Sequence, residues 1–440
     1  VGIIWFGGDD NDDDTAQPIV TAEPTRPSPT PLATSTPFVA QRANTIRIEL
    51  GQDAQTIIEQ HPAGTTFTFA SGIHRMQSIS PRNGDTFTGE PGAVLNGSRR
   101  LQNFMRQGNL WFVDGQTQQG DVLDIDWDQP FCQPGYERCI YPEELYIDHE
   151  PLIHVASLGE VRPGTWYFEY GTDRIYIGDD PNGRLIETSV TALAFRNTAD
   201  NVTVRDLTVE KYANPAQVGA ILGFERSGWL IQNVTTQLNH GPGIGLGEGM
   251  RVLNNRILNN GQIGLSSQGD NALIEGNEIA HNNFAKFSPF WEAGGAKLVG
   301  TENLVIRNNY VYNNGGPGLW LDIDNYNALI EDNIVVNNRR IGIYHEIGYA
   351  AVIRNNVVKF NNVADMPGVY GAQIQINTSQ DTEIYDNTVV VSQDGGNGIG
   401  IVQEQRGTGE RGAWVAHNNY VHSNTIIYMG AMGSSGVQVF

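Results

Sequence analysis

Residues 305–336 read "VIRNNYVYNNGGPGLWLDIDNYNALIEDNIVV", and one short pattern occurs in them twice, as "IRNNYV" and "IEDNIV". In each copy an aliphatic residue is followed by polar positions, an Asn and a second aliphatic residue. Asn309 and Asn333 hold the same place in the two copies. The unit is too short for a pair of helices, and its aliphatic residues alternate instead of recurring every three or four positions. The pattern therefore predicts short strands.

Six further copies occur, as "LIQNVT", "VLNNRI", "IEGNEI", "IRNNVV", "IYDNTV" and "AHNNYV". Aligning all eight puts one Asn of each copy in a common register: Asn233, Asn255, Asn277, Asn309, Asn333, Asn356, Asn387 and Asn419. The longer spacings between them contain insertions, most clearly "NFAKFSPFWEAGG". We expect parallel strands stacked coil on coil at about 4.8 Å around an aliphatic core. The Asn amides, which both donate and accept, would form a ladder along the stack.

This repeat resembles the right-handed parallel β-helix proteins of the pectate-lyase type, over residues 45–440. The resemblance implies an all-β, single-stranded right-handed parallel β-helix. Such proteins commonly begin with a capping helix, and "DAQTIIEQ" fits one, with Asp53 as N-cap and Ile57 and Ile58 on its apolar side. The fold hosts lyases, hydrolases, epimerases and phage adhesins, so it does not by itself indicate a reaction.

Four segments are expected. Residues 1–42 join "VGIIWFGG", a remnant of a signal or anchor, to an acidic and Pro/Thr-rich linker. Residues 43–126 form the cap and first coils, 127–188 an inserted β-hairpin subdomain similar to one in secreted carbohydrate enzymes, and 189–440 the main β-helix. Cys132 and Cys139, seven positions apart around a Pro-Gly pair, are predicted to form a disulfide.

The charge balance limits the partners of the chain. It has 27 basic and 49 acidic residues and a net charge of −22, which argues against binding to nucleic acid or to an anionic membrane. Apart from a lost N-terminal anchor, no direct membrane contact is expected. Together with the linker and the cysteines, this predicts a secreted or cell-surface protein.

The ladder register also predicts which side chains share a face. "GLWLDID" (318–324) stacks on "GIYHEIG" (342–348), which sets Trp320 beside Tyr344 and Asp322 beside Glu346. The face is continued on the neighbouring coils and comprises Trp291, Glu292, Lys297, Trp320, Asp322, Asp324, Tyr344, Glu346, Gln373 and Gln375. Carboxylates one coil apart repel, so one of the two pKa values should rise. His345 falls in the inward column and is predicted to be a buried, hydrogen-bonded core residue.

Aromatic rings beside carboxylates on a rigid face suit a polysaccharide or oligosaccharide, because a ring stacks on a sugar and acids bond hydroxyls or move protons. The candidate substrate-binding residues are Trp291, Trp320, Tyr344, His345, Gln373 and Gln375. The face could instead be a plain polar surface, or Trp320 and Tyr344 could pack beneath a loop.

Three functions follow. The favoured one is a glycoside hydrolase that needs no cofactor, with Asp322 as one catalytic group and Glu346 or Asp324 as the other; the sequence leaves retention and inversion open. The second is a lyase, because "EAGGAK" is similar to the Glu-x-x-x-x-Lys segment of the chondroitinase B and alginate lyase family. That resemblance implies Lys297 as Brønsted base and Glu292 as a calcium ligand. This chain has Asp322 where the family has an Arg, so neutralising a uronate carboxylate would fall to calcium held by Glu292, Asp322 or Asp324. The third is a non-catalytic glycan-binding or structural β-helix.

Overall fold

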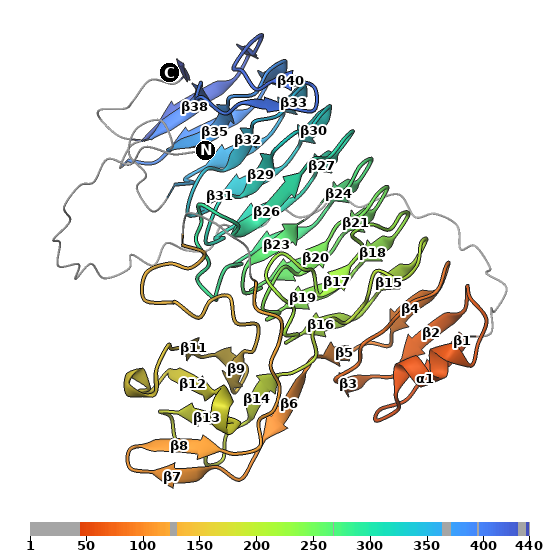
Figure 1. The fold of residues 1–440 in the computed structure, drawn as a ribbon. Helices are drawn as coiled ribbons and strands as arrows, with labels where there is room; N and C mark the ends of the chain where they lie inside the picture. The colour runs from red at the N-terminus through yellow and green to blue at the C-terminus, as the bar shows by residue number, and fades with distance from the viewer. Residues whose placement is uncertain are drawn as a thin grey trace. The chain divides into compact units, whose positions relative to one another are not determined.

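The protein was analysed as a computed structural model, which describes residues 45–123, 130–266, 268–362, 371–393, 396–429 and 437–439. The expected anchor remnant and linker at 1–42 lie outside these residues. Three long parallel sheets run along the molecule, because most coils add one strand to each of them (Figure 1). Among the described residues, no helix has the length and apolar character needed to cross a membrane.

The first sheet has twelve strands: β1 (Thr45–Ile48), β2 (Thr66–Phe69), β4 (Thr86–Gly89), β15 (Thr203–Arg205), β18 (Leu230–Gln232), β21 (Arg251–Leu253), β24 (Leu273–Glu275), β27 (Val305–Arg307), β30 (Ala328–Glu331), β33 (Ala351–Arg354), β36 (Thr382–Tyr385) and β41 (Tyr420–His422). The second has eleven: β3 (Gly72–Arg75), β5 (Ala93–Asn96), β16 (Thr208–Glu210), β19 (Thr235–Gln237), β22 (Arg256–Leu258), β25 (Glu278–Ala280), β28 (Tyr310–Tyr312), β31 (Ile334–Val336), β34 (Val357–Lys359), β37 (Thr388–Val391) and β42 (Thr425–Tyr428). The third has nine: β17 (Ile221–Leu222), β20 (Ile244–Gly245), β23 (Ile263–Ser266), β26 (Gly294–Val299), β29 (Leu319–Asp322), β32 (Ile343–Glu346), β35 (Ala372–Asn377), β38 (Asn397–Val402) and β43 (Val437–Val439).

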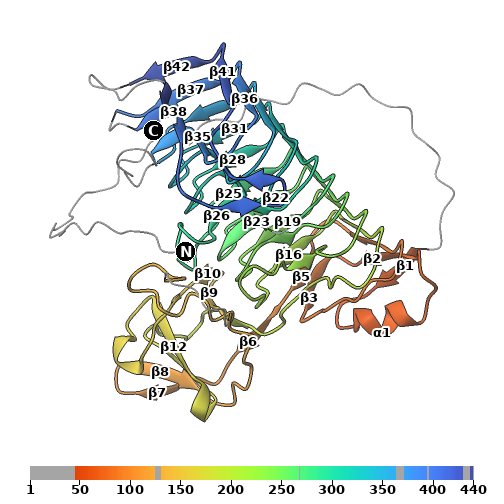
Figure 2. The same ribbon diagram turned by 45° about the horizontal axis from the view of Figure 1, so that its top comes forward.

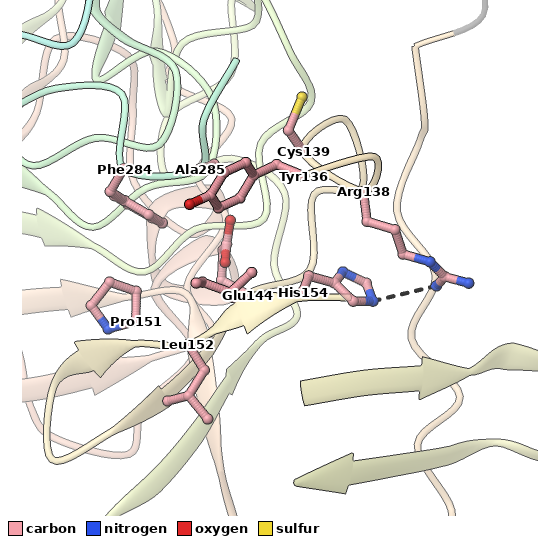
Figure 3. Close-up of a pocket in the computed structure, with 10 residues that line it drawn as sticks. Tyr136, Arg138, Cys139, Glu144, Pro151, Leu152, His154, Phe284 and Ala285 are labelled. Carbon is pink, nitrogen blue, oxygen red and sulfur yellow. Dashed lines mark hydrogen bonds between the residues drawn. The ribbon is translucent and has the colours of Figure 1, made fainter. Parts of the chain in front are cut away.

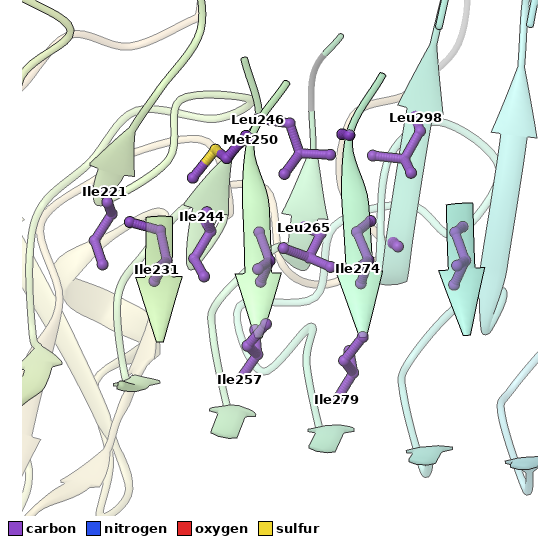
Figure 4. Packing of buried hydrophobic residues seen from close by; sticks show 14 of the residues in the cluster. Ile221, Ile231, Ile244, Leu246, Met250, Ile257, Leu265, Ile274, Ile279 and Leu298 are labelled. Atoms are coloured by element: carbon purple, nitrogen blue, oxygen red, sulfur yellow. The ribbon is translucent and has the colours of Figure 1, made fainter. Parts of the chain in front are cut away.

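The interior is a continuous aliphatic core. Ile274, Ile306 and Ile330 are paired from coil to coil in the first sheet, and each is fully buried. Figure 4 shows side chains of this kind stacked between the sheets. Since each coil contributes only a few inward-facing side chains, single coils could not form this core alone, and the stack as a whole is the stable unit.

The Asn ladder exists, but two of its predicted members are wrong. Nδ2 of each Asn donates to Oδ1 of the next at 2.9 or 3.0 Å, along Asn255, Asn277, Asn309, Asn333, Asn356, Asn387 and Asn424. Asn233 is replaced in this column by Val234, whose N–H donates to Asn255, because Asn233 itself takes a left-handed turn conformation. Asn419 lies in a different turn, where it accepts from the N–H of Thr382.

A second Asn ladder, which the sequence reading missed, follows the other turn. It runs through Asn239, Asn260, Asn282, Asn314, Asn338 and Asn361, again with amide-to-amide bonds of 2.9 or 3.0 Å. Asn361 then donates to Oε1 of Gln373 at 3.0 Å. The two ladders hold successive turns in register, so residues on facing strands remain neighbours over many coils.

The cap and the disulfide are as expected. Helix α1 (Ala54–Glu59) begins at Asp53, whose side chain accepts from the N–H of Thr56 at 2.7 Å, and it buries Ile58. Cys132 and Cys139 are bonded, with their Cα atoms 5.6 Å apart.

The insertion begins earlier than residue 127. Strands β6 (Ser98–Leu101), β9 (Leu145–Ile147), β10 (Glu150–Pro151) and β14 (Ile186–Ser189) form one of its sheets. Strands β7 (Met105–Gln107), β8 (Leu110–Val113), β11 (Ile153–His154), β12 (Thr165–Glu169) and β13 (Arg174–Ile177) form the other. The short helices η1 (Leu158–Glu160) and η2 (Tyr170–Thr172) link strands of the second sheet, and β39 (Thr408–Gly409) pairs with β40 (Gly412–Ala413) in a separate hairpin. Antiparallel pairing across the insertion takes up β6 to β8, which precede residue 127. Figure 2 shows these sheets beside the coils.

Candidate functional site

The candidate site lies on the outer face of the nine-stranded sheet. Lys297 on β26 pairs with Trp320 on β29, which pairs with Tyr344 on β32. The rings of Trp320 and Tyr344 stack with centroids 5.4 Å apart. Asp322 and Glu346 lie two residues beyond these rings and hence on the same face. The registration predicted from the ladder is therefore present in the structure.

Lys297 is the centre of one half of the site. Its Nζ lies 3.0 Å from Oδ2 of Asp322 and 3.8 Å from Oε1 of Glu292, and it donates to the backbone oxygen of Trp291 at 2.9 Å. It also lies 4.1 Å from the centroid of the Trp320 ring. Burial lowers the pKa of Lys297, but the charges of Asp322 and Glu292 outweigh that effect, so the pKa is raised and the ammonium stays charged.

Glu346 occupies the other half. Its Oε2 accepts from Nε1 of Trp320 at 3.1 Å, and its Oε1 pairs with Arg406 at 2.5 Å. Nδ2 of Asn377, on the next coil, reaches the same Oε1 at 3.5 Å. Burial, followed by the charge of Asp322, raises the pKa of Glu346 to about 7, although Arg406 and Lys297 act in the opposite direction. One of the two stacked acids therefore has a raised pKa, as expected.

The site is enclosed, and the rings of Trp320 and Tyr344 are buried with it, which agrees with the alternative that these two rings serve as packing. The side chains of Lys297, Glu292, Asp322 and Glu346 are each at most 10% exposed. Two polar atoms nevertheless have no hydrogen-bond partner among the described residues, namely Oδ1 of Asp322 and Oε2 of Glu292. Unpaired buried oxygens are costly, and a bound hydroxyl group would satisfy them.

Asp324 is not part of this face. Strand β29 ends at Asp322, and both Ile323 and Asp324 have positive φ, at 51° and 57°. This turn breaks the alternation that would have placed Asp324 beside Asp322. Oδ1 of Asp324 instead accepts from Nε1 of Trp414 at 3.0 Å and from the N–H of Glu410 at 3.2 Å.

Several predicted substrate-binding residues are buried by contacts within the fold. Trp291 packs against Phe131 of the disulfide loop at 4.7 Å between ring centroids. Gln373 ends the second Asn ladder and is 1% exposed, so its amide is used within the fold. Gln375 is fully buried beside Tyr344.

His345 is a core residue, as its inward column predicted. It is fully buried, and desolvation lowers its pKa to about 4, so the ring is neutral. Neither ring nitrogen has a hydrogen-bond partner among the described residues, contrary to the prediction and to what is usual for a buried imidazole.

The residues do not fit the calcium ion that the lyase resemblance implies. Lys297 places its ammonium between Glu292 and Asp322, and Asp324 faces elsewhere. Within the described part of the chain, no three Asp, Glu, His or Cys side chains gather in a way that could hold a metal.

Sequence reasoning missed the part of the site contributed by residues 403–414. Arg406 and Glu404 reach it from the loop after β38, and no repeat or motif marks that loop. A separate small cavity lies under the insertion, lined by Tyr136, Arg138, Glu144 and His154 (Figure 3). It does not include the acids on β29 and β32.

Comparisons with known proteins agree with the architecture. A family model described as "Right handed beta helix region" matches residues 219–389. Comparison with curated protein sequences gives no match. The solved structure titled "The complex structure of XylC with xylose" has a TM-score of 0.67 and 14% identity, covering 90% of this chain and 86% of that chain.

Two further structures are less similar. The surface adhesin PfbA of Streptococcus pneumoniae has a TM-score of 0.42 and 12% identity, with 90% of this chain and 93% of that chain covered. The A-module of the mannuronan C-5 epimerase AlgE6 of Azotobacter vinelandii has a TM-score of 0.39 and 11% identity, with 88% and 93% covered. Together with the parallel sheets, the family model and the XylC likeness show that the chain has the right-handed parallel β-helix fold.

Proposed function

We propose that the protein is a glycoside hydrolase in which Asp322 and Glu346 are the two catalytic carboxyl groups. The observation that carries this proposal is the difference between their surroundings. Asp322 is paired with the buried ammonium of Lys297 at 3.0 Å, whereas the pKa of Glu346 is raised to about 7. Two nearby acids with opposed environments are what a nucleophile or base and a general acid require.

The spacing supports a retaining reaction. Asp322 and Glu346 project from adjacent parallel strands, which are about 4.8 Å apart, close to the ~5 Å separation of retaining enzymes. In the first step Asp322 attacks the anomeric carbon, the glycosidic bond breaks, and Glu346 gives its proton to the departing oxygen. In the second step Glu346 takes a proton from water, whose oxygen displaces Asp322 from the sugar.

The contacts of Glu346 support placing its proton on Oε2. Oε1 is approached by Arg406 and Asn377, both of which can only donate with these groups. Oε2 receives one donor, Trp320, and so has the freer lone pair for the acidic hydrogen. Trp320 and Tyr344 would line the sugar site beside it, and the unpaired oxygens of Asp322 and Glu292 would accept from sugar hydroxyls.

The lyase alternative receives less support. A lysine accepts a proton only as the neutral amine, but the pKa of Lys297 is raised by Asp322 and Glu292 against the effect of burial. An ammonium in this position suits a structural and electrostatic role toward Asp322.

The test is turnover of a panel of aryl glycosides and oligosaccharides. The panel begins with pentosides, because the XylC structure was solved with xylose. We expect release of a reducing sugar whose first-formed anomer, followed by NMR, has the configuration of the substrate. A product that absorbs near 235 nm from a uronate polymer would indicate the lyase instead, and binding without turnover would indicate a glycan-binding protein.

We also propose that the protein is exported. The bond between Cys132 and Cys139 supports this, since disulfides persist in oxidising compartments. Immunodetection of the protein in culture supernatant or on intact cells would test it.

A further inference from the structure

The loop at 403–414 covers the site from a coil that carries neither catalytic acid. It follows β38 and folds back over earlier coils. Its backbone and side chains bond to Thr378, Tyr349, Asp324 and Glu302, chiefly through hydrogen bonds and one ion pair. Arg411 also lies over the ring of Tyr326 at 4.2 Å. The loop is thus fixed at several points, and one of its side chains, Arg406, turns toward Glu346.

Arg406 is shared between two acids. Its NH1 lies 2.5 Å from Oε1 of Glu346 and 3.1 Å from Oε2 of Glu404. Nδ2 of Asn377 lies 3.3 Å from the same oxygen of Glu404 and also donates to the hydroxyl of Tyr344 at 3.1 Å. Glu346 is therefore held from the loop side as well as by Trp320 on its own sheet.

All charged or titratable groups near Glu346 must be considered together. Asp322 and Lys297 face it from β29 and β26, Tyr344 from its own strand, and Arg406 and Glu404 from the loop. Two more lie farther off: Glu292, which contacts Lys297, and Arg340, which precedes β32 and is buried. Lys297 is already paired with Asp322, so Arg406 is the cation in direct contact with Glu346.

We propose that Arg406 is a positioning residue for Glu346: it binds Oε1, orients Oε2 toward the leaving oxygen, and sets the pH range over which Glu346 holds its proton. This inference rests on the proposed function. Glu404 weakens the interaction of Arg406 with Glu346, because it competes for the same guanidinium. Removing Arg406 would leave Glu346 facing Asp322 without its nearest cation, which favours the protonated acid.

The test compares Arg406→Gln, Arg406→Lys and Glu404→Gln by the pH dependence of kcat/KM. In Arg406→Gln we expect the pH at which kcat/KM falls on the alkaline side to rise by about one unit, because Glu346 keeps its proton to higher pH. We also expect kcat to fall at least tenfold. Arg406→Lys should return this alkaline midpoint of the kcat/KM profile toward its wild-type pH. Glu404→Gln should move it down, because Arg406 then interacts with Glu346 alone. Arg411→Gln is the matched control, since Arg411 belongs to the same loop but pairs with Glu302.

A readout without turnover separates this inference from the proposed function. Nε1 of Trp320 donates to Glu346, so Trp320 emission should titrate with that carboxyl. The Trp320→Phe variant identifies its share of the signal. A titration that moves in Arg406→Gln but not in Arg411→Gln supports the inference even if no glycoside is cleaved. If the alkaline midpoint of kcat/KM and the midpoint of the Trp320 fluorescence titration both stay at their wild-type pH in Arg406→Gln and in Glu404→Gln, the inference is wrong.

Discussion

Nζ of Lys297 lies 3.0 Å from Oδ2 of Asp322, on the neighbouring coil, with both side chains at most 10% exposed. The pair sets a positive charge directly beside the carboxylate on a face where neither group is well hydrated. The same ammonium contacts Glu292 and the face of Trp320, so one cation organises three groups of the site.

Lys297→Met should destabilise the protein by about 3 to 5 kcal/mol, because it leaves two buried carboxylates without their cation. Chemical denaturation gives the difference. Arg256→Met is the control: Arg256 also pairs across coils, with Glu278, but its side chain is 60% exposed, and the cost should stay below about 1 kcal/mol. Equal losses in the two variants would contradict the organising role of Lys297.

Asp322→Asn should reduce kcat by at least about 10³-fold while the fold is retained, because an amide cannot form the covalent intermediate. Asp324→Asn should stay within about fivefold of wild type, since Asp324 bonds the 403–414 loop and not the reaction centre. Circular dichroism and kinetics on both variants are the measurement. A larger loss in Asp324→Asn than in Asp322→Asn would exclude the assignment made here.

Glu346→Gln should change how stability depends on pH. The pKa of Glu346 is about 7 when folded, against an ordinary value of 4.5. Between these values the folded carboxyl holds a proton that the unfolded chain has lost, so this group makes wild-type stability fall as pH rises. The Gln variant lacks this titrating group and so lacks its contribution to the pH dependence of the free energy of unfolding.

The stability of Glu346→Gln relative to wild type should therefore increase by on the order of 3 kcal/mol from pH 4 to pH 8. Thermal or urea unfolding at a series of pH values measures it. Parallel curves for the two proteins would show that Glu346 has an ordinary pKa in the folded state.

Asn338→Asp should weaken the stack. Asn338 is fully buried, and its amide donates to Asn361 and to the backbone oxygen of Val311, which a carboxylate cannot do. We expect a loss of about 2 to 4 kcal/mol in denaturant unfolding. Asn337→Asp is the matched control, because Asn337 is a half-buried turn residue at φ 54°, a conformation that Asp tolerates. Equal free energies of unfolding for Asn338→Asp and Asn337→Asp would contradict the stabilising role of the Asn ladder.

Much of the architecture could be predicted because every copy of the repeat has the same pattern of aliphatic and Asn residues and therefore folds in the same way. Aliphatic residues at fixed positions of the repeat must share one core, and stacked Asn amides must share one column. The strands, their register and the pairing of Trp320 with Tyr344 could therefore be predicted from the spacing of the repeats. One of the two misplaced ladder residues, Asn233, lies one position before the column: it matches Asn254, and both have a φ of 55°, so Val234 takes the ladder position. The other, Asn419, lies in the turn before its strand instead of the turn after it.

The sequence by itself determined the repeat and hence which residues can stack, because strand alternation and coil length are local properties. Only the tertiary structure decided which acids share a site. The left-handed turn at Ile323 and Asp324 removes one acid from the face, and the return of the loop at 403–414 brings Arg406 to Glu346. Both depend on contacts between segments with no common period, so no counting along the chain could reveal them.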